Sequence, residues 1–143
     1  MSPINKSSIK DKLFKLQESI KIIEEILSEG EDKIISNERS KGALYFNLVI
    51  SIETILDIGN HILAESFNKP APSYKDIILS LGTTGVISKK FSEQNQEMGD
   101  FRNKIIHDYD RIDDVRALEY AKKAPEIFKT FAKTFVDFVE KNG

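Results

Sequence analysis

The sequence has no cysteine, no tryptophan and only two histidines, His61 and His107, among its 143 residues. Without cysteine the chain can form neither a disulfide nor a thiolate, which is typical of a reducing compartment, so we expect a cytoplasmic protein. A zinc site would have to recruit carboxylates or a second chain, because two histidines are too few ligands on their own. We therefore predict no metal and no cofactor.

Long apolar runs and a strong excess of charge are also lacking. The apolar runs are a few residues long, far short of the roughly 20 that span a bilayer, so we predict no membrane segment. The composition is 40% hydrophobic and 31% charged, with a net charge of −2. Proteins that hold nucleic acid by charge alone are usually strongly basic. Any RNA contact must therefore come from a local, shaped site or from one built by two subunits.

Apolar residues recur at helical spacing almost throughout the chain. The first stripe consists of Ile9, Leu13, Leu16, Ile20, Ile23 and Leu27. Ser8, followed three residues later by Asp11, is predicted to be the N-cap of this helix, and Gly30 its stop. A second helix is predicted over residues 36–67. It contains Gly42 and Gly59, and since each glycine costs about 1 kcal/mol relative to alanine, close helix contacts are expected there.

Two prolines, Pro70 and Pro72, interrupt the helical pattern, since proline does not fit inside a helix. Further helices are predicted over residues 73–81, capped by Ser73 with Asp76, then from Ser88 onward, and over residues 113–140 with Val115 facing inward. Pro125 should kink or split the last of these. The chain is predicted to be all-α, an antiparallel bundle of four to five helices forming a single domain over residues 1–143.

Arg102 and His107 lie in the fourth predicted helix. On a helical wheel Arg102 falls inside an apolar face, where an unpaired charge is costly, so it must meet a partner or an anion. His107 points about 140° away from Arg102 on a straight helix. Both can reach one phosphate only if the helix loosens near His107 or a symmetry mate completes the site.

These residue types suit RNA cleavage without a metal. Histidine is the usual base for the proton of a ribose 2′-hydroxyl at neutral pH, and the arginine fork is a fixed cation for the phosphate. Asn103 would orient the imidazole or bind a phosphate oxygen. A 2′-hydroxyl nucleophile would exclude DNA as substrate.

A purely structural interpretation fits the same spacing. Arg102 could pair with a neighbouring acid, Asp100, Asp108 or Asp110. His107 could be a cation placed near a helix C-terminus, where positive charge is favoured. Spacing alone leaves both interpretations open.

The stretch Arg102-Asn103-Lys104-Ile105-Ile106-His107-Asp108-Tyr109 resembles the signature of the HepT-like family of HEPN domains: Arg-Asn, three residues, His, one residue, Tyr. Other segments resemble the family and follow its order, namely residues 53–62, 72–76, 85–87 and 98–101. The similarity is clear from about Leu44 to Val115.

The resemblance implies the toxin of a type VII toxin–antitoxin module: a metal-independent endoribonuclease acting as a homodimer whose two motifs face one cleft. His107 would be its catalytic histidine, Arg102 its phosphate-binding arginine, and Asn103 the supporting polar residue. Tyr109 is similar to the tyrosine that the partner antitoxin, a minimal nucleotidyltransferase of the MntA type, modifies with AMP. Added phosphates would repel RNA from the cleft. Tyr109 follows Arg102 by seven residues, so the same helix face is expected for both.

Two other functions remain in competition with this one. The chain could be a non-catalytic HEPN-like binding module that docks to a nucleotidyltransferase and presents its substrate, or a plain structural bundle with Tyr109 closing its core. The presence of Arg102, Asn103, His107 and Tyr109 together favours the ribonuclease, because a scaffold has no need of all four.

Overall fold

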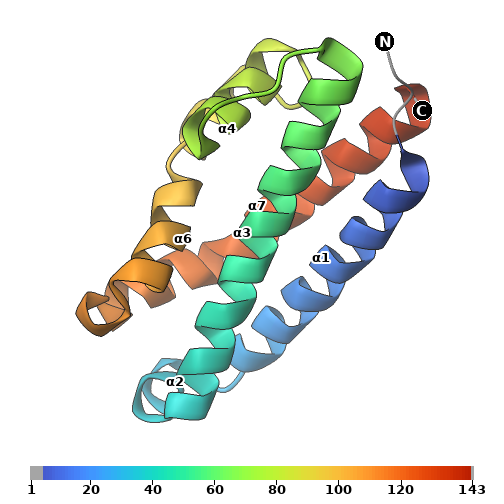
Figure 1. The fold of residues 1–143 in the computed structure, drawn as a ribbon. Helices are drawn as coiled ribbons and strands as arrows, with labels where there is room; N and C mark the ends of the chain where they lie inside the picture. Colours follow the sequence, from blue (N-terminus) through green and yellow to red (C-terminus); the bar gives the residue numbers. More distant parts are fainter. Residues whose placement is uncertain (1–4, 143) are drawn as a thin grey trace.

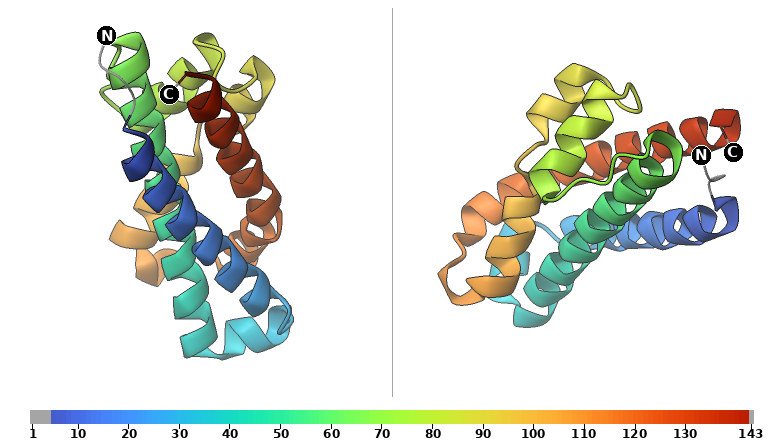
Figure 2. Two further views of the ribbon diagram at one scale, coloured as in Figure 1. Left: turned by 90° about the vertical axis from the view of Figure 1, so that its right-hand side faces the viewer. Right: turned by 45° about the horizontal axis from the view of Figure 1, so that its top comes forward.

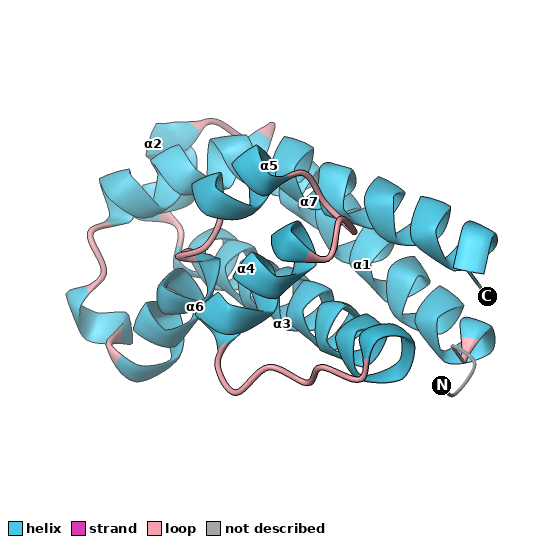
Figure 3. Ribbon diagram, turned by 90° about the horizontal axis from the view of Figure 1, so that it is seen from above, coloured by secondary structure: helices cyan, strands magenta, loops and turns pink. Residues whose placement is uncertain are grey.

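The computed structural model describes residues 5–142, so residues 1–4 and 143 of the predicted domain lie outside it. Its elements are α1 (Lys6–Leu27), α2 (Glu31–Ser36), α3 (Glu38–Phe67), α4 (Tyr74–Thr83), α5 (Lys89–Gln94), α6 (Met98–His107), the 3-10 turn η1 (Tyr109–Arg111) and α7 (Asp114–Asn142). Between residues 5 and 142 there is no strand (Figure 3). The predicted all-α bundle is confirmed. The structure adds the short α2 and divides the fourth predicted helix into α5 and α6.

Helix α3 is the centre of the bundle and contacts α1, α2, α4, α6 and α7. Figures 1 and 2 show α1 beside α3, with α7 crossing behind the pair and α4 and α6 on the other side of α3. The motif-bearing helix α6 therefore packs against α3. Side chains on α3 can reach α6 although the two helices are far apart in the sequence.

Three phenylalanines of α7, Phe128, Phe131 and Phe135, are completely buried among leucine and isoleucine side chains of the core. Burying a side chain of this size stabilises the fold by about 1.5–3 kcal/mol. Pro125 is also buried and does not split α7. The prediction that Val115 faces inward is wrong, because Val115 is 51% exposed in the first turn of α7, next to the exposed connection from α6.

Most of the predicted helix caps are present. The Ser73 hydroxyl accepts a hydrogen bond from the N–H of Asp76, and the Ser88 hydroxyl accepts one from the N–H of Phe91. The predicted cap at Ser8 is wrong. The Asn5 side chain accepts from the N–H of Ser8 instead, so α1 begins at Lys6.

Close contacts at two glycines join α4 to α3 and to α6. A Cβ on Gly59 would lie 2.8 Å from the Leu81 side chain, which confirms the predicted close contact at Gly59. A Cβ on Gly99 would lie 2.5 Å from the Cβ of Tyr74, so the start of α6 lies directly against the start of α4. The prediction of a close contact at Gly42 is wrong, since, apart from the adjacent residues and the nearby backbone of α3 itself, no heavy atom of the described chain lies within 4 Å of the Cβ position there.

Helix α3 is long and apolar enough to cross a membrane, judged by length and composition only. The mean hydropathy of its most apolar 18-residue window is 1.3, and 61% of that window is buried inside the bundle. The apolar residues of α3 thus serve as the core against which the other helices pack.

Candidate active site

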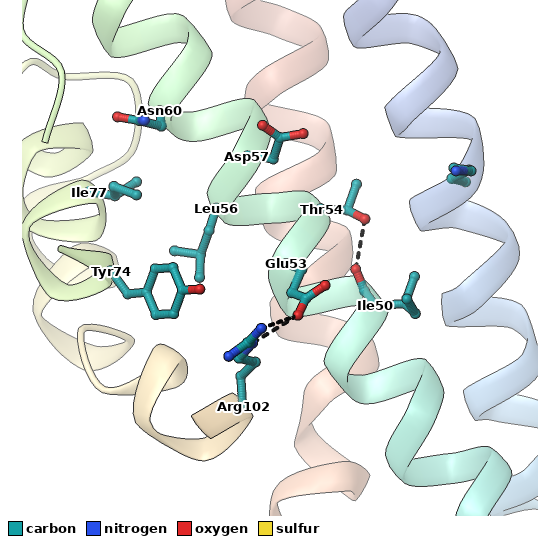
Figure 4. A pocket seen from close by; sticks show the side chains of 10 residues that line it. Ile50, Glu53, Thr54, Leu56, Asp57, Asn60, Tyr74, Ile77 and Arg102 are labelled. Carbon is teal, nitrogen blue, oxygen red and sulfur yellow. Dashed lines mark hydrogen bonds and ion pairs between the residues drawn. The ribbon is translucent and has the colours of Figure 1, made fainter. Parts of the chain in front are cut away.

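Arg102 forms an ion pair with Glu53, a residue of α3. Its Nε and Nη2 donate to the same carboxylate oxygen, Glu53 Oε1, over 2.8 Å and 2.6 Å (Figure 4). The Arg102 side chain is 19% exposed and that of Glu53 is 38% exposed. The alternative pairing with Asp100, Asp108 or Asp110 is therefore wrong. Arg102 lies on the side of α6 that faces α3, whereas these three acids are exposed.

Two further side chains hold the guanidinium of Arg102. Nη1 donates to the Asn103 Oδ1 over 3.0 Å, and the carbon between the guanidinium nitrogens lies 5.7 Å from the centre of the Tyr74 ring. A cation at this distance is attracted by the face of an aromatic ring. The structure thus places Asn103 in contact with Arg102, where it helps to fix the orientation of the fork.

The Arg102–Glu53 pair lies in the wall of an open pocket built by α1, α3, α4 and α6. Lys15, Asp57 and Tyr74 also line this pocket, and Figure 4 shows Tyr74 and Glu53 on either side of the Arg102 guanidinium. Lys12 pairs with Asp57 over 2.9 Å. The lining contains two basic side chains, Lys15 and Arg102, and two acidic ones, Glu53 and Asp57, so the pocket is not strongly basic.

His107 is the last residue of α6 and is exposed. The N–H of Asp108 still donates to the carbonyl of Lys104, after which the backbone leaves the helix. His107 is not one of the described residues that line the Arg102 pocket. A single chain therefore does not bring Arg102 and His107 into one pocket.

Tyr109 does not share a helix face with Arg102, so that prediction is wrong. The helix ends at His107, and Tyr109 begins the turn η1. The Tyr109 ring packs edge-on against the Tyr45 ring of α3, with centroids 5.9 Å apart and an angle of 75° between the planes. Tyr109 is 43% exposed, so it partly covers Tyr45 while remaining accessible from solvent.

Glu53 and Tyr74 are site residues that sequence reasoning did not single out for this role. A usable signal existed for Glu53, because an arginine on an apolar helix face needs an acid, and Glu53 is an acid within the long apolar helix α3. For Tyr74 the signal was its place in the family-like segment 72–76, which gave it no role of its own. Among residues 5–142, no group of three or more His, Cys, Asp or Glu side chains is arranged to hold a metal ion.

Solved structures share this arrangement of helices. A tri-AMPylated HEPN toxin of Shewanella oneidensis, in complex with an MNT antitoxin, superposes with a TM-score of 0.82 at 22% identity, covering 90% of this chain and 96% of that one. A toxin–antitoxin complex with AMP-PNP superposes with a TM-score of 0.81 at 21% identity, covering 89% and 96%. These similarities define the class of the fold, which is a HEPN-type helical bundle.

The sequence comparisons define the family. A profile described as Ribonuclease HepT-like matches residues 16–135. A protein of Archaeoglobus fulgidus, named as a candidate RNase, is 26% identical over 124 residues, which are 87% of this chain and 92% of that protein. The chain belongs to the HepT-like ribonuclease family, as its motif and flanking segments predicted.

Proposed function

We propose that this protein is the toxin of a type VII toxin–antitoxin module and a metal-independent endoribonuclease of the cytoplasm. The proposal rests on the way in which neighbouring side chains hold Arg102, the arginine of the family motif. Its guanidinium is oriented by Glu53, Asn103 and Tyr74 in the wall of an open pocket. A fixed, planar cation in such a position suits the phosphate of an RNA backbone.

In the proposed reaction His107 takes the proton of a ribose 2′-hydroxyl. The 2′-oxygen forms a bond to the adjacent phosphorus, the bond to the 5′-oxygen breaks, and the departing oxygen takes up a proton from water. Arg102 stabilises the negative charge that develops on the phosphate oxygens. Glu53 acts through Arg102 and is a positioning residue. DNA lacks the 2′-hydroxyl and is not a substrate.

A homodimer completes the proposed site. Arg102 and His107 of one chain do not line the same pocket. A two-fold axis beside α6 would bring the partner subunit's His107 toward Arg102 and create two equivalent sites. It would also double the positive charge near the cleft, which a chain with a net charge of −2 needs in order to hold RNA.

Tyr109 is the proposed site of control. It is 43% exposed and follows His107 by two residues, so AMP groups added to its hydroxyl would place negative charge beside the cleft and repel RNA. The proposed partner is an MntA-type nucleotidyltransferase antitoxin. The Shewanella oneidensis relative, a tri-AMPylated toxin in complex with an MNT antitoxin, supports this assignment.

The test is RNA cleavage by the purified protein, free of any antitoxin, in the presence of EDTA. We expect the wild type to cut RNA under these conditions and His107→Ala to be inactive. His61→Gln is the matched control because it removes the other histidine, which lies in α3 and is not among the residues that line the pocket. If His107→Ala cuts as fast as the wild type, the assignment is wrong. If no preparation cuts RNA but the wild type binds the transferase, a non-catalytic binding module is the better account.

A further inference from the structure

Tyr109 lies on the short connection between α6 and α7. The turn η1 has no buried residue. Its backbone is closed by two hydrogen bonds, from the N–H of Arg111 to the carbonyl of Asp108 over 2.8 Å and from the N–H of Ile112 to the carbonyl of Tyr109 over 3.4 Å. A turn of this kind does not by itself fix the direction of an exposed tyrosine side chain.

The side chain that Tyr109 contacts comes from the core helix α3. Tyr45 is 2% exposed, and its ring meets the Tyr109 ring in a T-shaped arrangement. Edge-to-face contacts of this geometry are favourable because the positive edge of one ring meets the negative face of the other. Tyr45 thus supports one side of Tyr109, which remains 43% exposed.

Tyr45 is itself held in place by the first turn of α7. Its hydroxyl donates a hydrogen bond to the Asp114 Oδ1. Lys41 Nζ lies 3.2 Å from the other oxygen of Asp114 and 3.2 Å from the Glu38 carboxylate. Asp113 accepts hydrogen bonds from the N–H groups of the following turn and so caps the start of α7. The start of α7, where the connection ends, is therefore bound to α3 next to the contact between Tyr45 and Tyr109.

Tyr45 and Tyr109 differ in chemical role because only Tyr45 is buried and bonded to Asp114. Burial, and then the hydrogen bond to Asp114, raise the pKa of Tyr45 far above the ordinary tyrosine value. Tyr45 consequently stays a protonated donor. Its buried hydroxyl is also out of reach of a large nucleotide, whereas Tyr109 is exposed.

We propose that Tyr45, fixed by Asp114 and Lys41, is a positioning residue that holds Tyr109 in the direction required for nucleotidyl transfer; this rests on the proposed modification of Tyr109. In the transfer the Tyr109 oxygen forms a bond to the α-phosphorus of ATP. The bond from that phosphorus to the oxygen bridging to the β-phosphate breaks, pyrophosphate leaves, and the phenol proton passes to water.

The size of the effect follows from what the contact supplies. An acceptor that is already oriented avoids part of the ordering that a free side chain undergoes when it enters an active site. Loss of the supporting ring should slow the addition of AMP by up to about tenfold, near the upper end of what the loss of an edge-to-face pair corresponds to. Loss of the Tyr45 hydroxyl alone should slow it by about threefold, since the ring remains but is no longer fastened to Asp114.

The experiment measures AMP addition by intact mass over time, using unmodified protein, ATP and the MntA-type transferase from the same genome. The variants are Tyr45→Leu, which removes the ring, and Tyr45→Phe, which keeps it. Tyr120→Phe is the matched control, because Tyr120 is a tyrosine of α7 whose buried hydroxyl has no hydrogen-bond partner in the described chain. Cleavage of RNA by each unmodified variant is measured in parallel.

We expect AMP addition to fall in the order wild type and Tyr120→Phe, then Tyr45→Phe, then Tyr45→Leu, while RNA cleavage stays within about twofold of wild type. Equal rates of AMP addition in all four proteins overturn the positioning role but leave modification of Tyr109 standing. Parallel losses of AMP addition and RNA cleavage also overturn it, because they indicate a general structural defect. If the wild type gains no AMP on Tyr109, the proposed modification fails and the positioning role fails with it.

A misfolded Tyr45→Leu does not end the test. Asp114→Asn then takes its place, because it weakens the contacts of Asp114 with Tyr45 and Lys41. Asp114 is 29% exposed, so this change disturbs the core less. A rate about threefold below wild type supports the proposal. The wild-type rate for Asp114→Asn together with the wild-type rate for Tyr45→Phe refutes it.

Discussion

Replacing Glu53 by glutamine removes the charge that holds Arg102 while leaving an oxygen of the same size in position. Arg102 donates to Glu53 through two nitrogens. Hydrogen bonds to charged groups contribute roughly 1.5–3 kcal/mol when shielded from water. Glu53 is 38% exposed, so water screens the pair, and we expect Glu53→Gln to lower the free energy of unfolding by about 1 kcal/mol. For a chain of this length that corresponds to a fall in Tm of roughly 3–5 °C.

The effect on catalysis should be larger than the effect on stability. Arg102 keeps its contacts with Asn103 and Tyr74 in Glu53→Gln, so the cation remains in the pocket but its fork is less well oriented. Displacements of about 1 Å in a catalytic group can cost up to 100-fold in rate. We expect kcat to decrease by about tenfold and the affinity for RNA to change by less than about threefold. Binding of a phosphate depends mainly on the charge of Arg102, which is kept, whereas catalysis also depends on the orientation of its guanidinium.

Asp57→Asn is the matched control for this substitution. Asp57 lies one turn further along α3, lines the same pocket and is 60% exposed in its pair with Lys12. Both variants remove one negative charge from the pocket, but only Glu53→Gln disturbs Arg102. Single-turnover RNA cleavage and thermal unfolding are measured for both. Equal behaviour of the two variants, or wild-type kcat in Glu53→Gln, would show that the ion pair does not position Arg102.

Further expectations concern packing, alkaline stability and regulation. Gly99→Ala should lower the free energy of unfolding by about 1–3 kcal/mol, because the new methyl group would meet Tyr74, whereas Gly42→Ala, with open space at its Cβ, should raise it by up to about 1 kcal/mol. Urea denaturation checks both. Burial raises the pKa of the Tyr120 hydroxyl, so above about pH 10 the unfolded chain loses a proton that the folded chain keeps, and stability falls as the pH rises. Tyr120→Phe should therefore lose less stability than wild type between about pH 9 and 11; a difference that does not change with pH would contradict this. Tyr109→Phe should keep cutting RNA in the presence of transferase and ATP, conditions that silence the wild type, and inhibition of both proteins would place the modification elsewhere.

Local patterns in the sequence predicted the helices well and their ends less well. The apolar stripe from Ile9 to Leu27 is a property of neighbouring residues and needs no knowledge of the fold. The start of α1 was misassigned because both Asn5 and Ser8 are good N-cap residues, and the choice depends on backbone geometry. The same limit applies to Tyr109, which the helical wheel places beside Arg102 only if the helix continues beyond His107.

The sequence did not predict which residues far apart in the chain contact each other in the fold. Four acids within the segment 100–113 surround Arg102 in the sequence, yet its partner is Glu53, which is 49 residues away. The T-shaped pair of Tyr45 and Tyr109 likewise joins α3 to the turn after α6. Both contacts depend on the packing of α6 and η1 against α3. The family motif identified the candidate residues, and the packing shows how Arg102 and Tyr109 are held.

The central claim, that each chain carries half of an RNA-cutting site, has a direct test by complementation. Arg102→Ala and His107→Ala are co-expressed with two different tags, and the mixed dimer is isolated through both. We expect each variant alone to be inactive, whereas the mixed dimer, which retains one of its two sites, should cut RNA in EDTA at about half the wild-type rate. A mixed dimer that is isolated intact and remains as inactive as its parents would contradict the account.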